Sequence, residues 1–164
     1  MLFRTLGDDI VYNDIPVAKQ LIDNYSKYQS SIVGCQEVKE SDVSKYGIVK
    51  PSKSLDEKTV EMADFIEKPS TEEAPSRLAC LGRYLLTPKI FEYLEKTEPG
   101  KGGEIQLTDA IVAMMKDGEK VLAYNFDGKR YDIGNKFGLL KANIEFGLRN
   151  EETREELLEY LKNI

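Results

Sequence analysis

The stretch VAKQLIDNYSKYQSSIVGCQEV, residues 17–38, joins a helical pattern to a strand pattern. Its first part predicts a helix, because apolar residues recur at the spacing of one helix face: Val17, Leu21, Ile22, Tyr25 and Tyr28. The part from residue 31 to residue 38 is a short apolar run that favours a buried strand. Helices that alternate with strands are typical of the α/β class.

The same alternation continues on both sides of this stretch. Strands are expected over residues 2–6, 46–49, 59–67, 78–87 and 121–126. Helices are expected over residues 88–94, 107–115, 137–148 and 151–161, the last of them capped by Asn150. Longer loops and adjacent strands near the middle favour a mixed sheet. The sequence therefore predicts an α/β fold with a mixed sheet, in a single domain of residues 1–164.

Composition restricts the kinds of partner. Hydrophobic residues make up 41% of the chain and charged residues 32%, which is the profile of a soluble globular protein. No apolar run approaches the roughly 20 residues that a membrane span needs. The net charge of −6 argues against nucleic acid or an anionic membrane as partner, but not against a small phosphorylated molecule.

The residue types that are present also restrict the chemistry. The chain has no histidine, which excludes Ser-His and Cys-His triads and histidine-based metal sites. Metal or acid–base chemistry must come from carboxylates, and phosphate contacts from Lys, Arg or backbone N–H groups. Cys35 and Cys80 have no metal-type or redox-type spacing, so we expect buried, reduced thiols in a cytoplasmic protein.

The first candidate for metal binding is Asp8, which follows a predicted strand and Gly7 and precedes Asp9. A carboxylate at the end of a strand lies where α/β proteins bind ligands, and Mg²⁺ prefers carboxylate and phosphate oxygens. Asp132, which precedes Gly134 and a predicted helix, is the candidate for a second ligand. The alternatives are a turn after a strand at Asp8 and an N-terminal helix cap at Asp132.

A second candidate site lies at Glu67–Lys68, where a predicted strand ends before Pro69. A carboxylate accepts hydrogen bonds from sugar hydroxyls, and an adjacent lysine neutralises a phosphate. Gly47 opens another predicted strand and could offer its backbone to a sugar hydroxyl. The alternatives are a solvated charge pair at Glu67–Lys68 and an ordinary strand glycine at Gly47.

In order and spacing, the chain resembles the C-terminal part of the bacterial UTP–glucose-1-phosphate uridylyltransferases. The motifs that carry the resemblance are LGDDIV at 6–11, YGI at 46–48, IEKP at 66–69, LGRY at 81–84, GGEIQLTDAI at 102–111 and RYDIG at 130–134. The run at 102–111 is the most specific, and its Thr108 is expected to bond locally or across a subunit interface. Glu104 is expected in the first turn of the helix that follows.

The resemblance implies a role for each matched residue. Asp8 and Asp132 would hold a catalytic Mg²⁺, and Asp9 would lie beside the first of these ligands, near the substrate. Glu67 would bind glucose hydroxyls, Lys68 the sugar phosphate, and Gly47 a hydroxyl through its backbone. Asp8, Lys68 and Asp132 would be the catalytic residues. The implied reaction transfers a uridylyl group from UTP to glucose 1-phosphate, giving UDP-glucose and pyrophosphate without a covalent enzyme intermediate.

One departure from the family limits these expectations. The family begins with a glycine-rich loop, followed by Thr-Arg and later by a Pro-Lys pair, which grips the nucleotide, and nothing in this chain matches it. We therefore expect the C-terminal part of a nucleotidyltransferase-type α/β/α sandwich, a fragment that more chain precedes and that is inactive alone. Without the first strands of the family, the sheet would have an exposed edge, which predicts a homo-oligomer.

Two further readings remain open. One is a thymidylyl- or adenylyltransferase that acts on the same sugar phosphate, because those enzymes share the Gly-Asp, Glu-Lys-Pro and later Asp elements. The other is a non-catalytic oligomerisation module, formed by the apolar stripe of the helix after residue 104 and by the last two helices.

Overall fold

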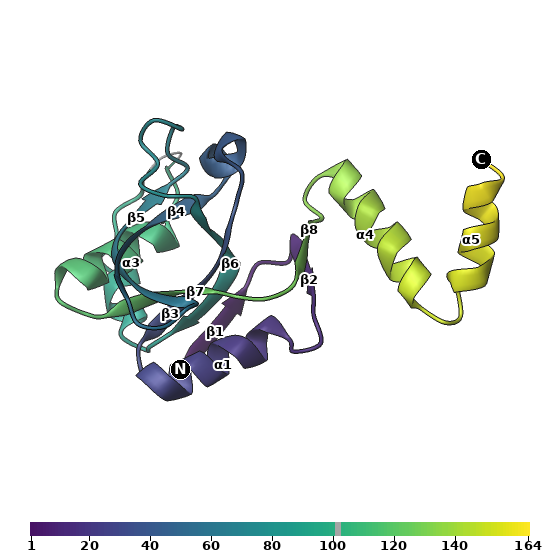
Figure 1. Cartoon of the computed structure of the whole chain (residues 1–164). Helices are drawn as coiled ribbons and strands as arrows, with labels where there is room; N and C mark the ends of the chain where they lie inside the picture. Colours follow the sequence, from purple (N-terminus) through teal and green to yellow (C-terminus); the bar gives the residue numbers. More distant parts are fainter. Residues whose placement is uncertain (101–102) are drawn as a thin grey trace. The chain divides into compact units, whose positions relative to one another are not determined.

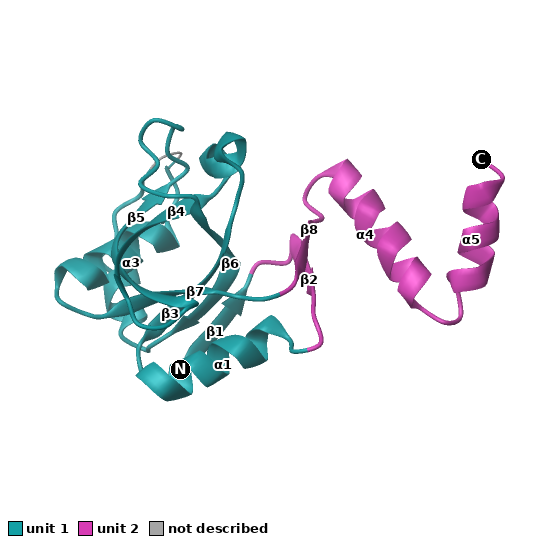
Figure 2. Ribbon diagram, viewed as in Figure 1, with its two compact units in different colours: residues 1–5, 15–127 teal, residues 6–14, 128–164 magenta. Residues whose placement is uncertain are grey.

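The computed structural model describes residues 1–100 and 103–164, which form two compact units (Figure 2). Residues 1–5 and 15–127 form the first, here called the sheet unit. Residues 6–14 and 128–164 form the second, here called the ribbon–helix unit. The stretch 98–103, which is rich in glycine, contains residues 101 and 102, which lie outside the described residues. The prediction of a single domain over 1–164 stays a prediction.

The described residues of the sheet unit include the following strands and helices, labelled in Figure 1 where there is room. The strands are β1 (Leu2–Thr5), β3 (Ser31–Glu37), β4 (Gly47–Ser54), β5 (Thr59–Glu67), β6 (Leu78–Leu86) and β7 (Val121–Asn125). The helices are α1 (Val17–Tyr28), the 3-10 helix η1 (Glu40–Lys45), α2 (Ile90–Leu94) and α3 (Leu107–Lys116).

The strands form one mixed sheet in the order β1-β6-β3-β7-β5-β4. Strands β3 and β7 run parallel, with Ser31 opposite Val121, and every other pairing is antiparallel. A further pairing of Ile48 with Ala79 joins β4 back to β6, so the sheet curls on itself. Within the described residues β1 pairs only with β6, which leaves its other edge open. The predicted mixed sheet is confirmed.

Alternate residues of β3 face opposite sides of the sheet, and both sides are covered. Val33 and Cys35 belong to the core cluster that contains Ile111 and Met114 of α3. Ile32, which precedes Val33, is also fully buried but points the other way, where α1 packs on β3 with Leu21 buried. A strand buried on both faces reads as a continuous apolar run, which is why β3 was recognisable in the sequence.

The two cysteines lie opposite each other on β3 and β6, and both are buried free thiols. Their burial confirms the predicted burial, whereas the predicted cytoplasmic location stays a prediction. Burial raises the pKa of the Cys35 thiol well above its ordinary value, and it raises the pKa of the Cys80 thiol to about 11. Both thiols are therefore uncharged in the folded protein at neutral pH.

The free energy of unfolding is expected to fall at alkaline pH because of Cys80. Its thiol loses a proton near pH 9.0 when unfolded but only near 11 when folded, so the stabilisation is complete below pH 9 and is lost as the pH rises toward 11. Between pH 8 and pH 10.5, we expect wild type to lose about 2 kcal/mol more than Cys80→Ala. Urea unfolding of both proteins at pH 8 and pH 10.5 measures this difference. Equal losses in the two proteins would contradict the assignment.

The ribbon–helix unit consists of β2 (Asp9–Tyr12), β8 (Lys129–Asp132), α4 (Lys136–Arg149) and α5 (Arg154–Lys162) (Figure 1). The two strands pair antiparallel, with Asp9 opposite Asp132 and Tyr12 opposite Lys129. Helix α4 packs on this ribbon through Phe146, whose ring centroid lies 5.9 Å from that of Tyr12 and 5.5 Å from that of Tyr131. The unit thus has an aromatic cluster of its own.

Several predicted boundaries are wrong, each for a local reason. Strand β4 continues to Ser54, beyond the predicted 46–49, because it pairs with β5 along this length. Helix α3 begins at Leu107, so Glu104 precedes its first turn. Helix α5 begins at Arg154 after Thr153, and the side chain of Asn150 instead accepts a hydrogen bond from the Glu152 N–H, within the turn before the helix. None of the helices in the described residues is long and apolar enough to cross a membrane.

Candidate functional site

Three carboxylates gather at one end of the β2–β8 ribbon. Asp9 begins β2 and faces Asp132, the last residue of β8, in the strand register. The backbone extends this pairing, because the Ile133 N–H donates to the Asp8 carbonyl oxygen over 2.9 Å. The pairing thus brings together residues more than 120 positions apart in the sequence, as the metal prediction requires.

Asp8 and Asp132 converge on the space beside Gly134. A Cβ atom on Gly134 would lie 3.3 Å from Asp132 Oδ1 and 3.9 Å from Asp8 Oδ2. The Gly134 N–H donates to Asp132 Oδ1 over 3.1 Å, which orients that carboxylate. Two carboxylates that approach one small space suit a hard divalent cation, which prefers oxygen ligands. The described residues contain no group of three or more His, Cys, Asp or Glu that could hold a metal, so the protein would supply only part of the ligand set.

Asp132 does not serve as the N-terminal cap that the alternative reading gave it. Asn135 caps α4, because its side-chain oxygen accepts a hydrogen bond from the Gly138 N–H over 2.7 Å. The Asn135 amide in turn donates to the Asp132 backbone carbonyl over 3.2 Å. The Asp132 carboxylate is therefore not committed to capping the helix.

Asp9 lies beside the other two carboxylates but is held by Arg130. The distance from Arg130 Nε to Asp9 Oδ1 is 2.6 Å, and the two side chains are only 15% and 8% exposed. Burial raises the pKa of Asp9, while Arg130 opposes that shift and the nearby Asp8 and Asp132 add to it. The pair joins β2 to β8, so Asp9 contributes to the shape of the carboxylate cluster. A contact between Asp9 and substrate stays a prediction.

The second cluster lies in the sheet unit, where β5 ends. Glu67 is the last residue of β5, and Lys68 follows it with a positive φ of 46°. The Lys68 N–H donates to the Tyr46 carbonyl oxygen over 3.0 Å, and Lys68 Nζ lies 3.7 Å from Glu67 Oε1. A lysine in the left-handed region is unfavourable and persists where its surroundings impose it, which is frequent at functional sites. The turn leaves the Lys68 ammonium group available at the surface, with 60% of its side chain exposed.

Gly47 faces this cluster from the neighbouring strand. It is the register partner of Glu67, and a Cβ atom on Gly47 would lie 2.6 Å from the Phe65 ring and 3.0 Å from Glu67 Oε2. Only glycine fits here without displacing one of these side chains. The structure thus brings Gly47, Glu67 and Lys68 together, and their roles toward a sugar phosphate stay predictions.

Thr108 is a member of this cluster that the sequence reading missed. Its Oγ1 donates to Glu67 Oε2 over 2.8 Å, and the residue is buried in the first turn of α3. The expectation of a local bond or a subunit contact was wrong. Helix α3 packs against β5, and the Thr108 hydroxyl therefore reaches Glu67, the last residue of β5. The signal was present in the sequence as the most specific motif, at residues 102–111, but its partner was 41 positions away.

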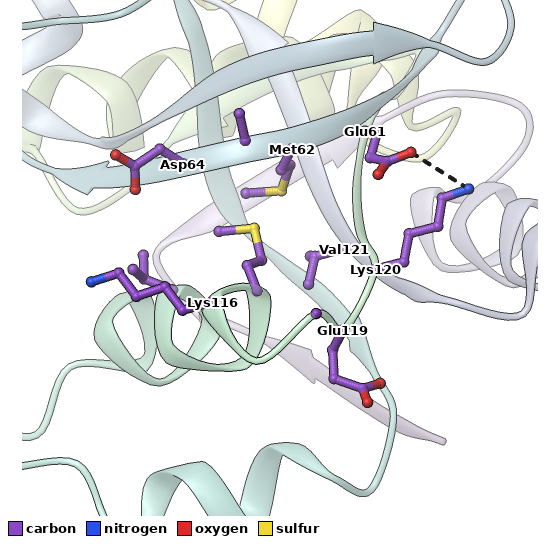
Figure 3. A pocket seen from close by; sticks show the side chains of 11 residues that line it. Glu61, Met62, Asp64, Lys116, Glu119, Lys120 and Val121 are labelled. Atoms are coloured by element: carbon purple, nitrogen blue, oxygen red, sulfur yellow. Dashed lines mark ion pairs between the residues drawn. The ribbon is translucent and has the colours of Figure 1, made fainter.

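A pocket of about 360 Å³ opens elsewhere in the sheet unit, between β5 and α3 (Figure 3). Met62 and Met115 are among the residues that line it. Lys120 and Glu61 form an ion pair of 3.7 Å at its side. No predicted site residue lines this pocket. The candidate chemistry therefore belongs to the two polar clusters and not to this hollow.

The protein thus combines a mixed α/β sheet, carboxylates at a strand end and an acid–lysine pair at the end of another strand. The chain belongs to the nucleotidyl transferase family, whose model matches residues 2–147. This match confirms the class predicted from the sequence.

Individual relatives of the chain indicate a narrower group within this family. The chain is 48% identical over 159 residues to UTP–glucose-1-phosphate uridylyltransferase 1 of Staphylococcus saprophyticus, a match that covers 97% of this chain and 55% of that protein. It is 47% identical to the UTP–glucose-1-phosphate uridylyltransferase of Staphylococcus epidermidis, over 97% of this chain and 54% of that protein. The predicted resemblance is confirmed, and the chain spans about half the length of the curated relatives it matches.

Solved structures agree with the predicted fold. A UDP-glucose pyrophosphorylase crystallised with UDP-glucose superimposes with a TM-score of 0.84 at 44% identity, covering 89% of this chain and 55% of that one. A UTP-bound UGPase from Acinetobacter baumannii gives a TM-score of 0.84 at 34% identity, covering 98% of this chain and 55% of that one. The predicted fold class, part of a nucleotidyltransferase α/β sandwich with a mixed sheet, is confirmed.

Proposed function

We propose that this chain carries the sugar-phosphate and metal residues of a UTP–glucose-1-phosphate uridylyltransferase. The reaction joins a phosphate oxygen of glucose 1-phosphate to the α-phosphorus of UTP and releases pyrophosphate. The observation that carries the proposal is the Glu67–Lys68 cluster, with a carboxylate fixed from the interior and an exposed ammonium group beside it, in a chain 48% identical to an enzyme of that name.

In the sugar-phosphate cluster, each side chain has a distinct part. Glu67 accepts hydrogen bonds from glucose hydroxyls, because an ionised carboxylate is an acceptor only. Lys68 offsets the charge of the sugar phosphate, and the Gly47 backbone lies open to a hydroxyl. No proton shuttle or covalent nucleophile is needed, since the attacking group is already an anionic oxygen. The rate comes from holding two anions in line and offsetting their charge.

In the carboxylate cluster, Asp8 and Asp132 would hold Mg²⁺, and phosphate oxygens and water would complete the ligand set. When bound, the ion offsets phosphate charge and polarises the reacting phosphoryl group. Two contacts support the positions of these carboxylates. The Gly134 N–H orients Asp132, and the Arg130–Asp9 pair keeps β2 and β8 in register.

Titration calorimetry of this chain with glucose 1-phosphate in Mg²⁺ tests the proposal. We expect saturable binding at one site per chain. Absence of binding would favour the non-catalytic module over either nucleotidyltransferase reading.

The uridylyl reading is preferred to the thymidylyl one because a putative glucose-1-phosphate thymidylyltransferase from Bacillus anthracis superimposes less closely, with a TM-score of 0.65 at 25% identity. We also propose a homo-oligomer, supported by the edge of β1 that is unpaired within the described residues. A cytoplasmic location stays a prediction.

Turnover by this polypeptide alone is expected to be negligible, because nothing in the sequence matches the glycine-rich, nucleotide-binding loop of the family. With UTP, glucose 1-phosphate and Mg²⁺, we expect pyrophosphate release no faster than in a sample without protein. A coupled pyrophosphate assay measures this, with a full-length uridylyltransferase as the positive control. Sustained release by this chain would show that UTP is bound by other means.

A further inference from the structure

The carboxylate of Glu67 is anchored from the protein interior by Thr108. Thr108 Oγ1 donates to Glu67 Oε2 over 2.8 Å, and Thr108 is only 4% exposed. The Glu67 side chain is 31% exposed, so its carboxylate spans the boundary between the core and the surface. One carboxylate oxygen of Glu67 is thus bonded to a buried residue of α3.

The two carboxylate oxygens of Glu67 have different surroundings. Oε2 accepts the Thr108 hydroxyl and lies where a Cβ atom on Gly47 would come within 3.0 Å. Oε1 lies on the side of the Lys68 ammonium group, 3.7 Å from its Nζ. A carboxylate offers about four acceptor positions over its two oxygens. The hydroxyl of Thr108 takes one acceptor position on Oε2 and leaves Oε1 for a ligand.

The separation of donor and acceptor is set by core packing. Phe65 of β5 belongs to the same buried cluster as Ala110 and Ile111 of α3, so the strand and the helix are held against each other. The branched side chain of threonine has few χ1 rotamers in a helix, which restricts the direction of its hydroxyl. A stiff donor on a fixed helix selects one rotamer of the longer and more flexible glutamate.

We propose that Thr108 is a positioning residue for the sugar: it holds Glu67 in the rotamer that presents Oε1 to the hydroxyls of glucose 1-phosphate. The inference rests on the proposed function, because it takes Glu67 as the sugar-binding carboxylate. It assigns Thr108 no contact with substrate. Because Thr108 fixes the Glu67 side chain before the sugar binds, less side-chain conformational entropy is lost on binding.

The first test uses no ligand. Thr108→Val keeps the branched shape and removes the hydroxyl, whereas Thr108→Ser keeps the hydroxyl. NMR three-bond couplings along the Glu67 side chain are expected to show one rotamer in wild type and in Thr108→Ser, and rotamer averaging in Thr108→Val. Amide spectra of the variants establish that they are folded. A single rotamer in folded Thr108→Val would overturn the inference.

The second test separates sugar positioning from general damage. In calorimetry, Thr108→Val is expected to bind glucose 1-phosphate about tenfold more weakly, the order of effect of one hydrogen bond to a charged group, with recovery in Thr108→Ser. Inorganic phosphate, which needs only Lys68, is expected to bind wild type and Thr108→Val alike. Equal losses for both ligands would mean a structural defect and overturn the inference.

The proposed function and this inference fail in different ways. If wild type does not bind glucose 1-phosphate, the proposed function is wrong, and the sugar-binding part of the inference is wrong with it. The NMR couplings still show whether Thr108 holds the Glu67 side chain in one rotamer. If wild type binds glucose 1-phosphate and Thr108→Val binds it equally well, only the inference is wrong.

Discussion

Replacing Lys68 with alanine is expected to weaken glucose 1-phosphate binding by about tenfold, because a hydrogen bond to a charged group contributes about 1.5–3 kcal/mol, an exposed one lies at the low end of that range, and 1.4 kcal/mol is tenfold. The ammonium group lies at the surface beside Glu67 and is the cation that this cluster offers to the phosphate. The backbone at residue 68 has a positive φ, which alanine tolerates about as well as lysine does. The substitution therefore removes the charge with little change in the turn.

Titration calorimetry with glucose 1-phosphate measures the effect. Lys53→Ala is the matched control, because Lys53 is an exposed lysine of β4 in the same unit. We expect this control to bind as wild type does. An unchanged affinity in Lys68→Ala, or an equal loss in Lys53→Ala, would mean that the phosphate is bound elsewhere or through diffuse charge alone.

Replacing Asp132 with asparagine is expected to reduce divalent metal affinity by about 100-fold, since loss of even an outer-shell partner costs about 10–100-fold and Asp132 is proposed as a direct ligand. Asparagine keeps a carbonyl oxygen that can accept the Gly134 N–H, so the local turn is preserved. What it removes is one of the two negative charges that converge beside Gly134.

The measurement is binding of Mn²⁺ as a paramagnetic probe, followed by water proton relaxation, with Mg²⁺ as competitor. Glu155→Gln, in α5 of the same unit, removes an exposed charge away from the ribbon and serves as control. Asp8→Asn should resemble Asp132→Asn. If the relaxation signal persists in both aspartate variants, this cluster does not hold the metal and the ribbon has another role.

The chemistry proposed here suits a chain without histidine. Uridylyl transfer to an anionic phosphate oxygen requires charge compensation and alignment more than proton transfer. The structure provides fixed carboxylates in one unit and a fixed acid–lysine pair in the other. Each is held by backbone or side-chain hydrogen bonds from the elements around it.

The sequence by itself determined the class of the protein and the residues to consider. The alternation of helix and strand patterns predicted the α/β fold, since a period of 3.6 or of 2 depends only on neighbours along the chain. The buried strands β3 and β6 were recognisable because strands covered on both faces are apolar along their length. The ordered motifs identified the family, and they placed Asp8, Glu67, Lys68 and Asp132 at predicted ends of strands or starts of helices.

Only the tertiary structure decided which of these residues meet. The strands β2 and β8 are four residues each, too short for a clear period, and they exist because they pair with each other across more than 110 positions. That register places Asp8 and Asp132 beside Gly134, and it pairs Asp9 with Arg130. The contact from Thr108 to Glu67 likewise depends on how α3 packs against β5. Local sequence patterns encode the direction of a side chain within its own element, whereas its partner in another element is set by how the two pack.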